Sequence, residues 1–188
     1  MRIISGSIKG KKLFEPKDIL TRPLKDIVKE SIFNLIQHSN KFNLNIQNSK
    51  VLDLFSGTGS FGLECLSRES SLVVFLENYN EALNILKKNI NYCNFENRAK
   101  VIEKDIFNLD FSDLKKEKFD IIFLDPPFKK KINDLIIYIF EKNLLSENSI
   151  IIIHRHKNEK ELLSKKFNIL DERVYGNSKI FFGNYLSK

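Results

Sequence analysis

Four consecutive residues, Asp125-Pro126-Pro127-Phe128, carry the clearest chemistry in the sequence. They follow the apolar run IIFL, which predicts a buried strand, and the two prolines end it because neither can donate to a strand ladder. A carboxylate, rigid backbone carbonyls and an aromatic ring together suit a planar base with an exocyclic amine. Asp125 and the Pro126 carbonyl would accept the amine hydrogens while Phe128 stacks on the ring. Such acceptors localise the amine lone pair and aim it at an electrophile.

A glycine-rich stretch earlier in the chain, LDLFSGTGSFGLE, contains Gly57, Gly59 and Gly62 in the G-x-G-x-x-G spacing of nucleotide-binding loops. In an open α/β sheet, ligands bind beyond the carboxyl ends of the strands, so this loop would hold a cofactor. Its glycines let the backbone approach the ligand, and the following helix offers its N-terminal amides. The stretch therefore predicts a nucleotide-type cofactor.

The carboxylate of Asp53, four residues before the first glycine, favours one cofactor over another. A pyrophosphate is best held by an uncompensated helix N-terminus, which a nearby carboxylate opposes. S-adenosylmethionine carries an ammonium and a sulfonium, and a carboxylate suits both. Glu77 ends the next strand candidate, where an acidic residue binds the ribose hydroxyls of either cofactor. Asp105 ends the third strand candidate and is expected either to bind the adenine amine or to cap a helix.

Alternating strand and helix patterns predict the elements that would position these residues. Apolar runs such as IIFL and IIII are typical of central strands covered on both faces. The clearest helix spans residues 79–94 and has one apolar face, and helical patterns lie between the first five strands. This alternation indicates a doubly wound parallel sheet. The strand candidates are residues 51–55, 72–77, 100–105, 119–124, 149–154, 168–174 and 179–186.

The last two strand candidates are separated only by residues 175–178, so they must be antiparallel. A seven-stranded, mostly parallel sheet with an antiparallel last strand is the layout of class I S-adenosylmethionine-dependent methyltransferases, a Rossmann-like α/β fold. Residues 2–14 predict a short β-hairpin, and a helix is expected from Pro23 to about Gln37. We therefore expect one methyltransferase domain over residues 1–188, with residues 1–37 as an N-terminal extension and 50–188 as the catalytic core.

The composition argues against several other classes of protein. No apolar run reaches the roughly 18–20 residues that span a bilayer, and the first residues lack the features of a signal peptide. Cys65 and Cys93 form no C-x-x-C, and the histidines show no ligand spacing, so neither a disulfide framework nor a metal site is predicted. We expect a cytoplasmic monomer without membrane association, in which both cysteines are buried free thiols.

The net charge of +7 favours a polyanionic partner. The chain is rich in Lys, Ile, Asn and Phe together, a bias that AT-rich coding alone would produce, so the placement of the lysines has to decide. One group directly follows the Asp-Pro-Pro-Phe motif and another falls in the N-terminal hairpin, where both could meet the phosphates of a flipped-out nucleotide. The lysines expected to contact RNA are Lys9, Lys11, Lys12, Lys129, Lys130 and Lys131.

Together these motifs resemble the RsmD family, the 16S rRNA (guanine-N2)-methyltransferases of bacteria. The [DN]-P-P-[FY] tetrapeptide is typical of methyltransferases that act on the amino groups of adenine, guanine or glutamine. The matching segments span nearly the whole chain: RIISG, TRPLKDIVKESIFNLI, VLDLFSGTGSFGLECLSR, FLENYNEALNILKKNI, LDPPF and VYGNSKIFF.

The resemblance implies transfer of a methyl group from S-adenosylmethionine to the exocyclic N2 amine of a guanine in 16S rRNA, within an assembled or nearly assembled 30S subunit. It places the catalytic motif at residues 125–128. The chain departs from the family at Leu24, where Thr is usual, and at Lys29, which replaces Arg and lacks its bidentate fork. The cofactor-binding residues that it implies are Arg22, Pro23, Asp53, Phe55, Gly57, Gly59, Glu77, Asn78, Asp105 and Ile106.

Three other functions remain open on the sequence alone. An adenine-N6 DNA methyltransferase would use the same chemistry, although we find no target-recognition insertion of the kind that DNA enzymes carry. A non-catalytic RNA-binding or assembly protein would have no use for an intact Asp-Pro-Pro-Phe motif. An NAD-dependent oxidoreductase conflicts with Asp53.

Overall fold

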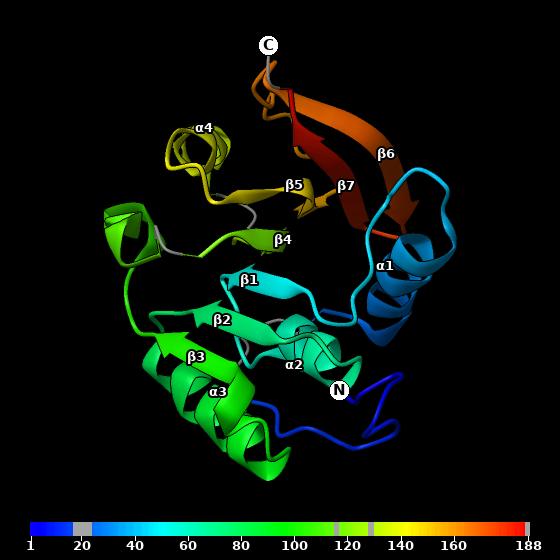
Figure 1. Cartoon of the computed structure of the whole chain (residues 1–188), viewed down its shortest axis with the longest axis vertical. Coiled ribbons are helices and arrows are strands. Elements are labelled where there is room, and N and C mark those ends of the chain that lie inside the picture. The colour runs from blue at the N-terminus through cyan, green and yellow to red at the C-terminus, as the bar shows by residue number, and fades with distance from the viewer. Residues whose placement is uncertain (17–23, 115–116, 128–129, 187–188) are drawn as a thin grey trace.

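The computed structural model of the chain describes residues 1–16, 24–114, 117–127 and 130–186. Its described part contains a seven-stranded sheet in the order β3-β2-β1-β4-β5-β7-β6 (Figure 1). The strands are β1 (Lys50–Leu54), β2 (Leu72–Leu76), β3 (Ala99–Ile102), β4 (Phe119–Leu124), β5 (Leu145–His156), β6 (Phe167–Tyr175) and β7 (Ser178–Tyr185). The first five strands pair in parallel, and β7 is antiparallel to both β5 and β6. This is the expected class I methyltransferase fold.

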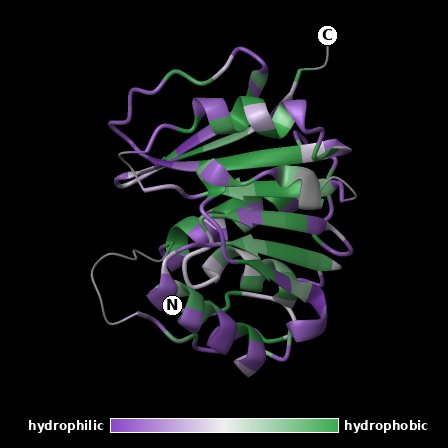
Figure 2. Ribbon diagram, turned by 90° about the vertical axis from the view of Figure 1, so that its left-hand side faces the viewer, coloured by the Kyte–Doolittle hydropathy of each residue, from purple (hydrophilic) through white to green (hydrophobic). Residues whose placement is uncertain are grey.

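Helices cover both faces of the sheet, which gives three layers (Figure 1). On one face lie α1 (Asp26–His38), α2 (Ser60–Ser67), α3 (Asn80–Tyr92) and the N-terminal segment. On the other lie α4 (Asn133–Glu141) and the short turns that follow β3. Figure 2 shows the apolar strands at the centre and polar residues toward the outside. Alternate strand residues serve the two faces, so that Val51 packs in one buried cluster and Leu52 in the other.

The topology brings the candidate functional loops to one edge of the sheet. Strands β1 to β4 are parallel, so their carboxyl ends meet along the same edge. The chain leaves β1 toward β2 and β3 and then returns to β4 on the other side of β1. Ligands bind in α/β sheets at such a switch point. The loops after these four strands therefore surround one candidate site.

The sequence predicts a helix between β3 and β4, but the described residues of this segment form no α-helix. The structure has two short 3-10 helices there, η2 (Ile106–Asn108) and η3 (Phe111–Leu114), while a third, η1 (Glu96–Arg98), precedes β3. The Asp105 side chain starts η2 by accepting a hydrogen bond from the Phe107 amide at 3.0 Å. The buried side chains of this segment, Ile106, Leu109, Phe111 and Leu114, lie at spacings of three and two residues, which a straight α-helix cannot point at one surface.

The N-terminal hairpin is less regular than expected, with one isolated antiparallel bridge between Arg2 and Lys12. Ile3, Gly10 and Leu13 donate across the hairpin, but the amides of Ile4 and Ser5 both donate to the buried carboxylate of Glu64 on α2, at 2.7 and 2.9 Å. Lys29 of α1 is also fully buried against Glu64, with the two charged groups 3.9 Å apart. This buried cluster ties the N-terminal segment, α1 and α2 together.

Cys65 and Cys93 are buried free thiols, as the sequence predicts, and burial raises the pKa of both.

In the part of the chain that the structure describes, every helix is too short or too polar to cross a bilayer.

Candidate active site

The glycine loop follows β1 directly and leads into α2. Phe55 and Gly57 both have positive φ, 61° and 54°, and Gly59 enters the helix at φ 87°. A side chain added at Gly57 would meet nothing within 4 Å, so the loop is open on that side. At Gly62, in contrast, an added Cβ would lie 2.3 Å from the ring of Phe75. The third glycine of the motif therefore serves the packing of α2 on β2, while the first leaves room for a ligand.

Glu77 closes the same loop from the end of β2. One of its carboxylate oxygens accepts a hydrogen bond from the Gly57 amide at 2.8 Å, and the other accepts from the amides of Asn78 and Tyr79 at 2.9 Å. Three backbone donors thus fix a carboxylate that remains half-buried. The Gly57 amide, which an anionic ligand would need, already has a negatively charged partner.

Asp53 lies deeper than the sequence prediction supposed. Its side chain points toward α2, where it accepts a hydrogen bond from the Gly62 amide at 3.0 Å, and only 1% of the residue is exposed. Burial raises the pKa of Asp53 well above its ordinary value; the Gly62 hydrogen bond opposes this, and the charges of Asp125 and Glu77 raise it further. The three carboxylates therefore share one acidic environment, although Asp53 does not itself lie at the open surface.

The loop after β3 supplies a polar cap and an aromatic side chain. Asp105 caps η2 through the Phe107 amide, which is the capping role left open above, and contact with an adenine amine stays a prediction. Ile106 is buried, but 43% of Phe107 is exposed. The rings of Phe107 and Phe55 lie 5.8 Å apart, and the ammonium of Lys130 lies 5.5 Å from the Phe107 ring centre. The sequence analysis missed Phe107; an aromatic residue two positions after the capping acid was the available signal.

The Asp-Pro-Pro-Phe motif, whose catalytic role stays a prediction, begins where β4 ends. The Asp125 amide donates to the Leu54 carbonyl at 3.4 Å, so Asp125 stands beside the start of the glycine loop. Pro126 is buried and Pro127 is exposed, which turns the chain out of the sheet. Of the remaining predicted site residues, Phe128 and Lys129 lie outside the described residues, as do Arg22 and Pro23.

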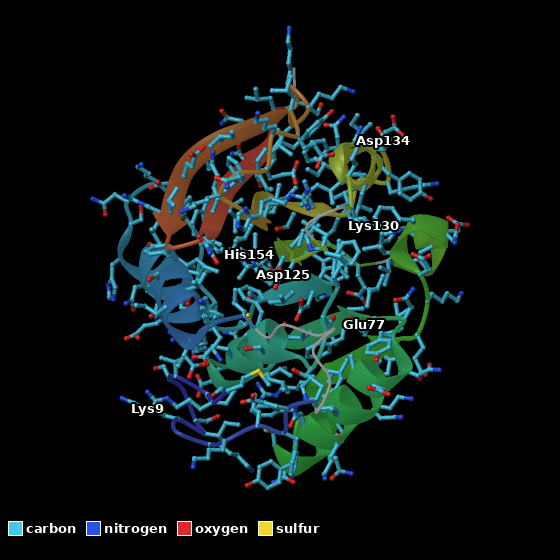
Figure 3. All side chains as sticks on the ribbon, turned by 180° about the vertical axis from the view of Figure 1, so that it is seen from behind. Lys9, Glu77, Asp125, Lys130, Asp134 and His154 are labelled. Carbon is cyan, nitrogen blue, oxygen red and sulfur yellow. The ribbon has the colours of Figure 1, made fainter. Side chains whose placement is uncertain are left out.

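A histidine that the sequence analysis set aside contacts the carboxylate of Asp125. The Nδ1 atom of His154 lies 2.7 Å from the Oδ1 atom of Asp125, and the two residues stand side by side in Figure 3. The strand register explains the contact. Leu124 at the end of β4 pairs with Ile153 of β5, and the residues that follow them are Asp125 and His154, respectively. Finding this partner required the order of the strands, which the sequence analysis did not predict.

The sequence of the chain matches a known protein family over nearly its whole length. The family model described as "Conserved hypothetical protein 95" matches residues 1–184. The chain belongs to this family. It is the RsmD family whose motifs the sequence resembles.

Relatives with known names and structures cover nearly the same length. Ribosomal RNA small subunit methyltransferase D of Haemophilus influenzae is 34% identical over 179 residues, which cover 94% of this chain and 89% of that protein. The putative rRNA methyltransferase YlbH of Bacillus subtilis is 37% identical over 164 residues, 86% of this chain and 85% of its own. The crystal structure of a putative methylase from Haemophilus influenzae is 32% identical with a TM-score of 0.72, over 99% of this chain and 98% of that one. Family and fold agree with the expected cofactor, S-adenosylmethionine.

The lysines expected to contact RNA fall on two sides of the site of this RsmD-family chain. Lys130 and Lys131 are exposed after the catalytic motif, and in Figure 3 Lys130 and Lys9 lie on opposite sides of Asp125. Lys9 and Lys12 are exposed on the N-terminal segment. Lys11 is engaged with α3, where its ammonium donates to the Tyr92 carbonyl at 2.5 Å and lies 4.1 Å from the ring centre. Contact of any of them with RNA stays a prediction.

Among the described residues, no three or more His, Cys, Asp or Glu side chains come together in a group that could hold a metal ion.

Proposed function

We propose that the protein transfers a methyl group from S-adenosylmethionine to the exocyclic N2 amine of a guanine in 16S rRNA of the small ribosomal subunit. The observation that carries the proposal is the position of Asp125, whose partly exposed carboxylate stands between the glycine loop and His154. Relatives named as small subunit rRNA methyltransferases support the choice of substrate. The proposed substrate of this chain is a 30S particle in the cytoplasm. The protein would act as a monomer, because one copy of the chain carries all the residues that the proposal uses.

The residues around the glycine loop fit S-adenosylmethionine better than a dinucleotide. A pyrophosphate would have to displace the Glu77 carboxylate from the Gly57 amide and would be repelled by its charge. The same charge attracts an ammonium and a sulfonium. Glu77, fixed by three amides, would hold the ribose hydroxyls, and the open side of Gly57 leaves room for the ligand. When bound, S-adenosylmethionine supplies an electrophilic methyl group.

Asp125 would bind and orient the target amine. His154 engages Oδ1, which leaves Oδ2 to accept one amine hydrogen, while the Pro126 carbonyl accepts the other. The lone pair of a guanine amine is delocalised into the ring, and two fixed acceptors draw it back onto the nitrogen. The amine is too weak an acid for Asp125 to deprotonate in advance. Its proton becomes acidic once the nitrogen has gained a fourth bond, and Oδ2 is then placed to receive it.

A guanine can reach this position only if it leaves its base stack. Lys130 and Lys131 are exposed next to the catalytic motif, where they would hold the phosphates on either side of the flipped nucleotide. Phe107 offers an exposed aromatic ring between the glycine loop and Lys130 for a base or for the cofactor's adenine.

The substrate class can be tested with S-adenosylmethionine labelled on its methyl group. The purified protein is incubated with 30S subunits from cells that lack the activity, with 50S subunits, and with unmethylated DNA. We expect label in the RNA of 30S subunits alone, and none with Asp125→Ala. Label in DNA would support the adenine-N6 alternative. Absence of transfer to all three substrates, together with RNA binding, would support a non-catalytic RNA-binding protein.

A further inference from the structure

Asp125 is the open end of a chain of hydrogen bonds that crosses three neighbouring strands. Its Oδ1 atom lies 2.7 Å from Nδ1 of His154 on β5, and the other ring nitrogen of His154, Nε2, lies 2.9 Å from the hydroxyl oxygen of Ser178 at the start of β7. Strands β4, β5 and β7 are adjacent in the sheet. The side chain of Asp125 is 20% exposed and that of His154 is 9% exposed, so the imidazole is the most buried member of the chain, which ends at the partly exposed Ser178.

The direction of these hydrogen bonds follows from their end groups. A carboxylate can only accept, so Nδ1 of His154 must carry the proton that is donated to Asp125. In a neutral imidazole the other nitrogen is then an acceptor, and the Ser178 hydroxyl can donate to it. The partner of one ring nitrogen selects which tautomer the other presents. Asp125 therefore selects the tautomer with a protonated Nδ1, and the Ser178 hydroxyl, which can donate or accept, pairs with the Nε2 atom of that tautomer.

We propose that His154 is a positioning residue for the methyl-transfer step. It holds Oδ1 of Asp125 so that Oδ2 faces the target amine, and the contact with Ser178 fixes the orientation of the imidazole ring. The inference rests on the proposed function, since it assigns Asp125 the orienting role described above. A carboxylate at the end of a strand can rotate about its side-chain bonds, and a charge-assisted hydrogen bond from a buried imidazole restricts this rotation. Misplacement of a catalytic group by about 1 Å can lower a rate by roughly 100-fold.

Matched variants separate the hydrogen bond from packing. His154→Leu keeps an apolar body but removes the donor, whereas His154→Asn keeps an amide N–H close to the position of Nδ1. We expect His154→Leu to lower kcat by roughly 10- to 100-fold while KM for either substrate changes by less than about twofold. His154→Asn should recover most of that loss, and Ser178→Ala should have a smaller effect. His38→Gln, an exposed change at the end of α1, is the control and should leave kcat unchanged.

The protonation of His154 can be observed without any substrate. The chain has three histidines, so ¹⁵N-labelled histidine gives few signals, and His154→Asn identifies the one that belongs to His154. We expect Nδ1 of His154 to carry a proton. An unprotonated Nδ1 overturns the inference, as does a folded His154→Leu protein with the kcat of the wild type, or a folded His154→Asn protein as slow as His154→Leu. If the wild type transfers no methyl group to any substrate, the proposed function fails, while the spectrum still reports on the hydrogen bond.

Discussion

The carboxylate of Glu77 and the backbone amide of Gly57 are 2.8 Å apart, and their hydrogen bond joins the ends of β1 and β2. The adjacent backbone makes a second link, because the Ser56 amide donates to the Leu76 carbonyl at 2.9 Å. The glycine loop is thus held in place before any ligand arrives, with a fixed negative charge at its open side. This arrangement suits a cationic cofactor with a ribose and opposes a pyrophosphate.

Replacing Glu77 should therefore weaken cofactor binding. We expect Glu77→Ala to reduce the affinity for S-adenosylmethionine or S-adenosylhomocysteine by about 1–3 kcal/mol, the range for removal of a charge-assisted hydrogen bond. Isothermal titration calorimetry measures this change, with Glu141→Gln, an exposed change at the end of α4, as the control. The wild type should show no measurable binding of NAD. Binding of NAD as strong as that of S-adenosylhomocysteine would contradict the assignment of the cofactor.

Two substitutions of Asp125 distinguish an orienting group from an obligatory base. Asn keeps a carbonyl oxygen that can accept from the amine while its NH2 group donates to Nδ1 of His154 in the other tautomer, but it cannot take up a proton at neutral pH. We expect Asp125→Ala to lower the rate by at least about 100-fold, the scale of removing one preorganised polar partner, with cofactor affinity intact. Asp125→Asn should retain clearly more activity than Ala. Single-turnover rates on 30S subunits provide the comparison, and an equal collapse of both variants would favour a general base.

The raised pKa of Asp53 predicts a pH-dependent stability. At a pH between the ordinary pKa of an aspartate and the raised folded-state pKa, Asp53 is protonated in the folded protein and ionised in the unfolded chain. Its favourable contribution is therefore complete below the ordinary pKa of an aspartate and is lost as the pH rises through the raised folded-state pKa. Asp53→Asn does not ionise and still offers an oxygen to the Gly62 amide. The variant should match the wild type at acidic pH and become relatively more stable as the pH rises.

Denaturant unfolding of both proteins over a series of pH values measures this difference in the free energy of unfolding. A constant difference across the series would show that Asp53 ionises with an ordinary pKa in the folded protein.

The exposed lysines after the catalytic motif should contribute to the salt dependence of RNA binding. We expect Lys130→Gln with Lys131→Gln to weaken RNA binding and to leave cofactor affinity unchanged. The slope of log affinity against log salt should fall by about 0.7–0.9 for each phosphate that the variant no longer neutralises. The matched control is Lys118→Gln with Lys142→Gln, at the opposite edge of the sheet, where β4 begins and α4 ends. Equal slopes for the two double variants would mean that Lys130 and Lys131 are only solvated surface.

Local patterns in the sequence were sufficient to predict most of the sheet. The runs around Val73, Ile122 and Ile152 are continuous and apolar because these strands are covered on both faces, and each was found. The helix expected between β3 and β4 failed because its apolar spacing is set by packing under the sheet and by the Asp105 cap. The N-terminal hairpin is irregular because two of its amides, those of Ile4 and Ser5, bond to Glu64, which lies far away in the sequence.

The sequence predicts only those site residues that can be recognised from their type and their local spacing. The glycine loop, Glu77 and Asp125 did so, and the structure brings them to one edge of the sheet. The role of His154 depends on β5 lying next to β4, a pairing that no local pattern contains. The burial of Asp53 likewise follows from the side of the sheet on which α2 packs.

The nucleoside that the enzyme produces tests the central claim most directly. 30S subunits from cells that lack the activity are incubated with the wild-type protein and S-adenosylmethionine, and the 16S rRNA is digested and analysed by mass spectrometry against standards. The account predicts N2-methylguanosine at one site, with about one modified nucleoside for each 30S subunit. It predicts no N2-methylguanosine with the Asp125→Ala protein. Methyl groups on adenine N6, on a ring nitrogen or on a ribose, or no modified nucleoside at all, would contradict it.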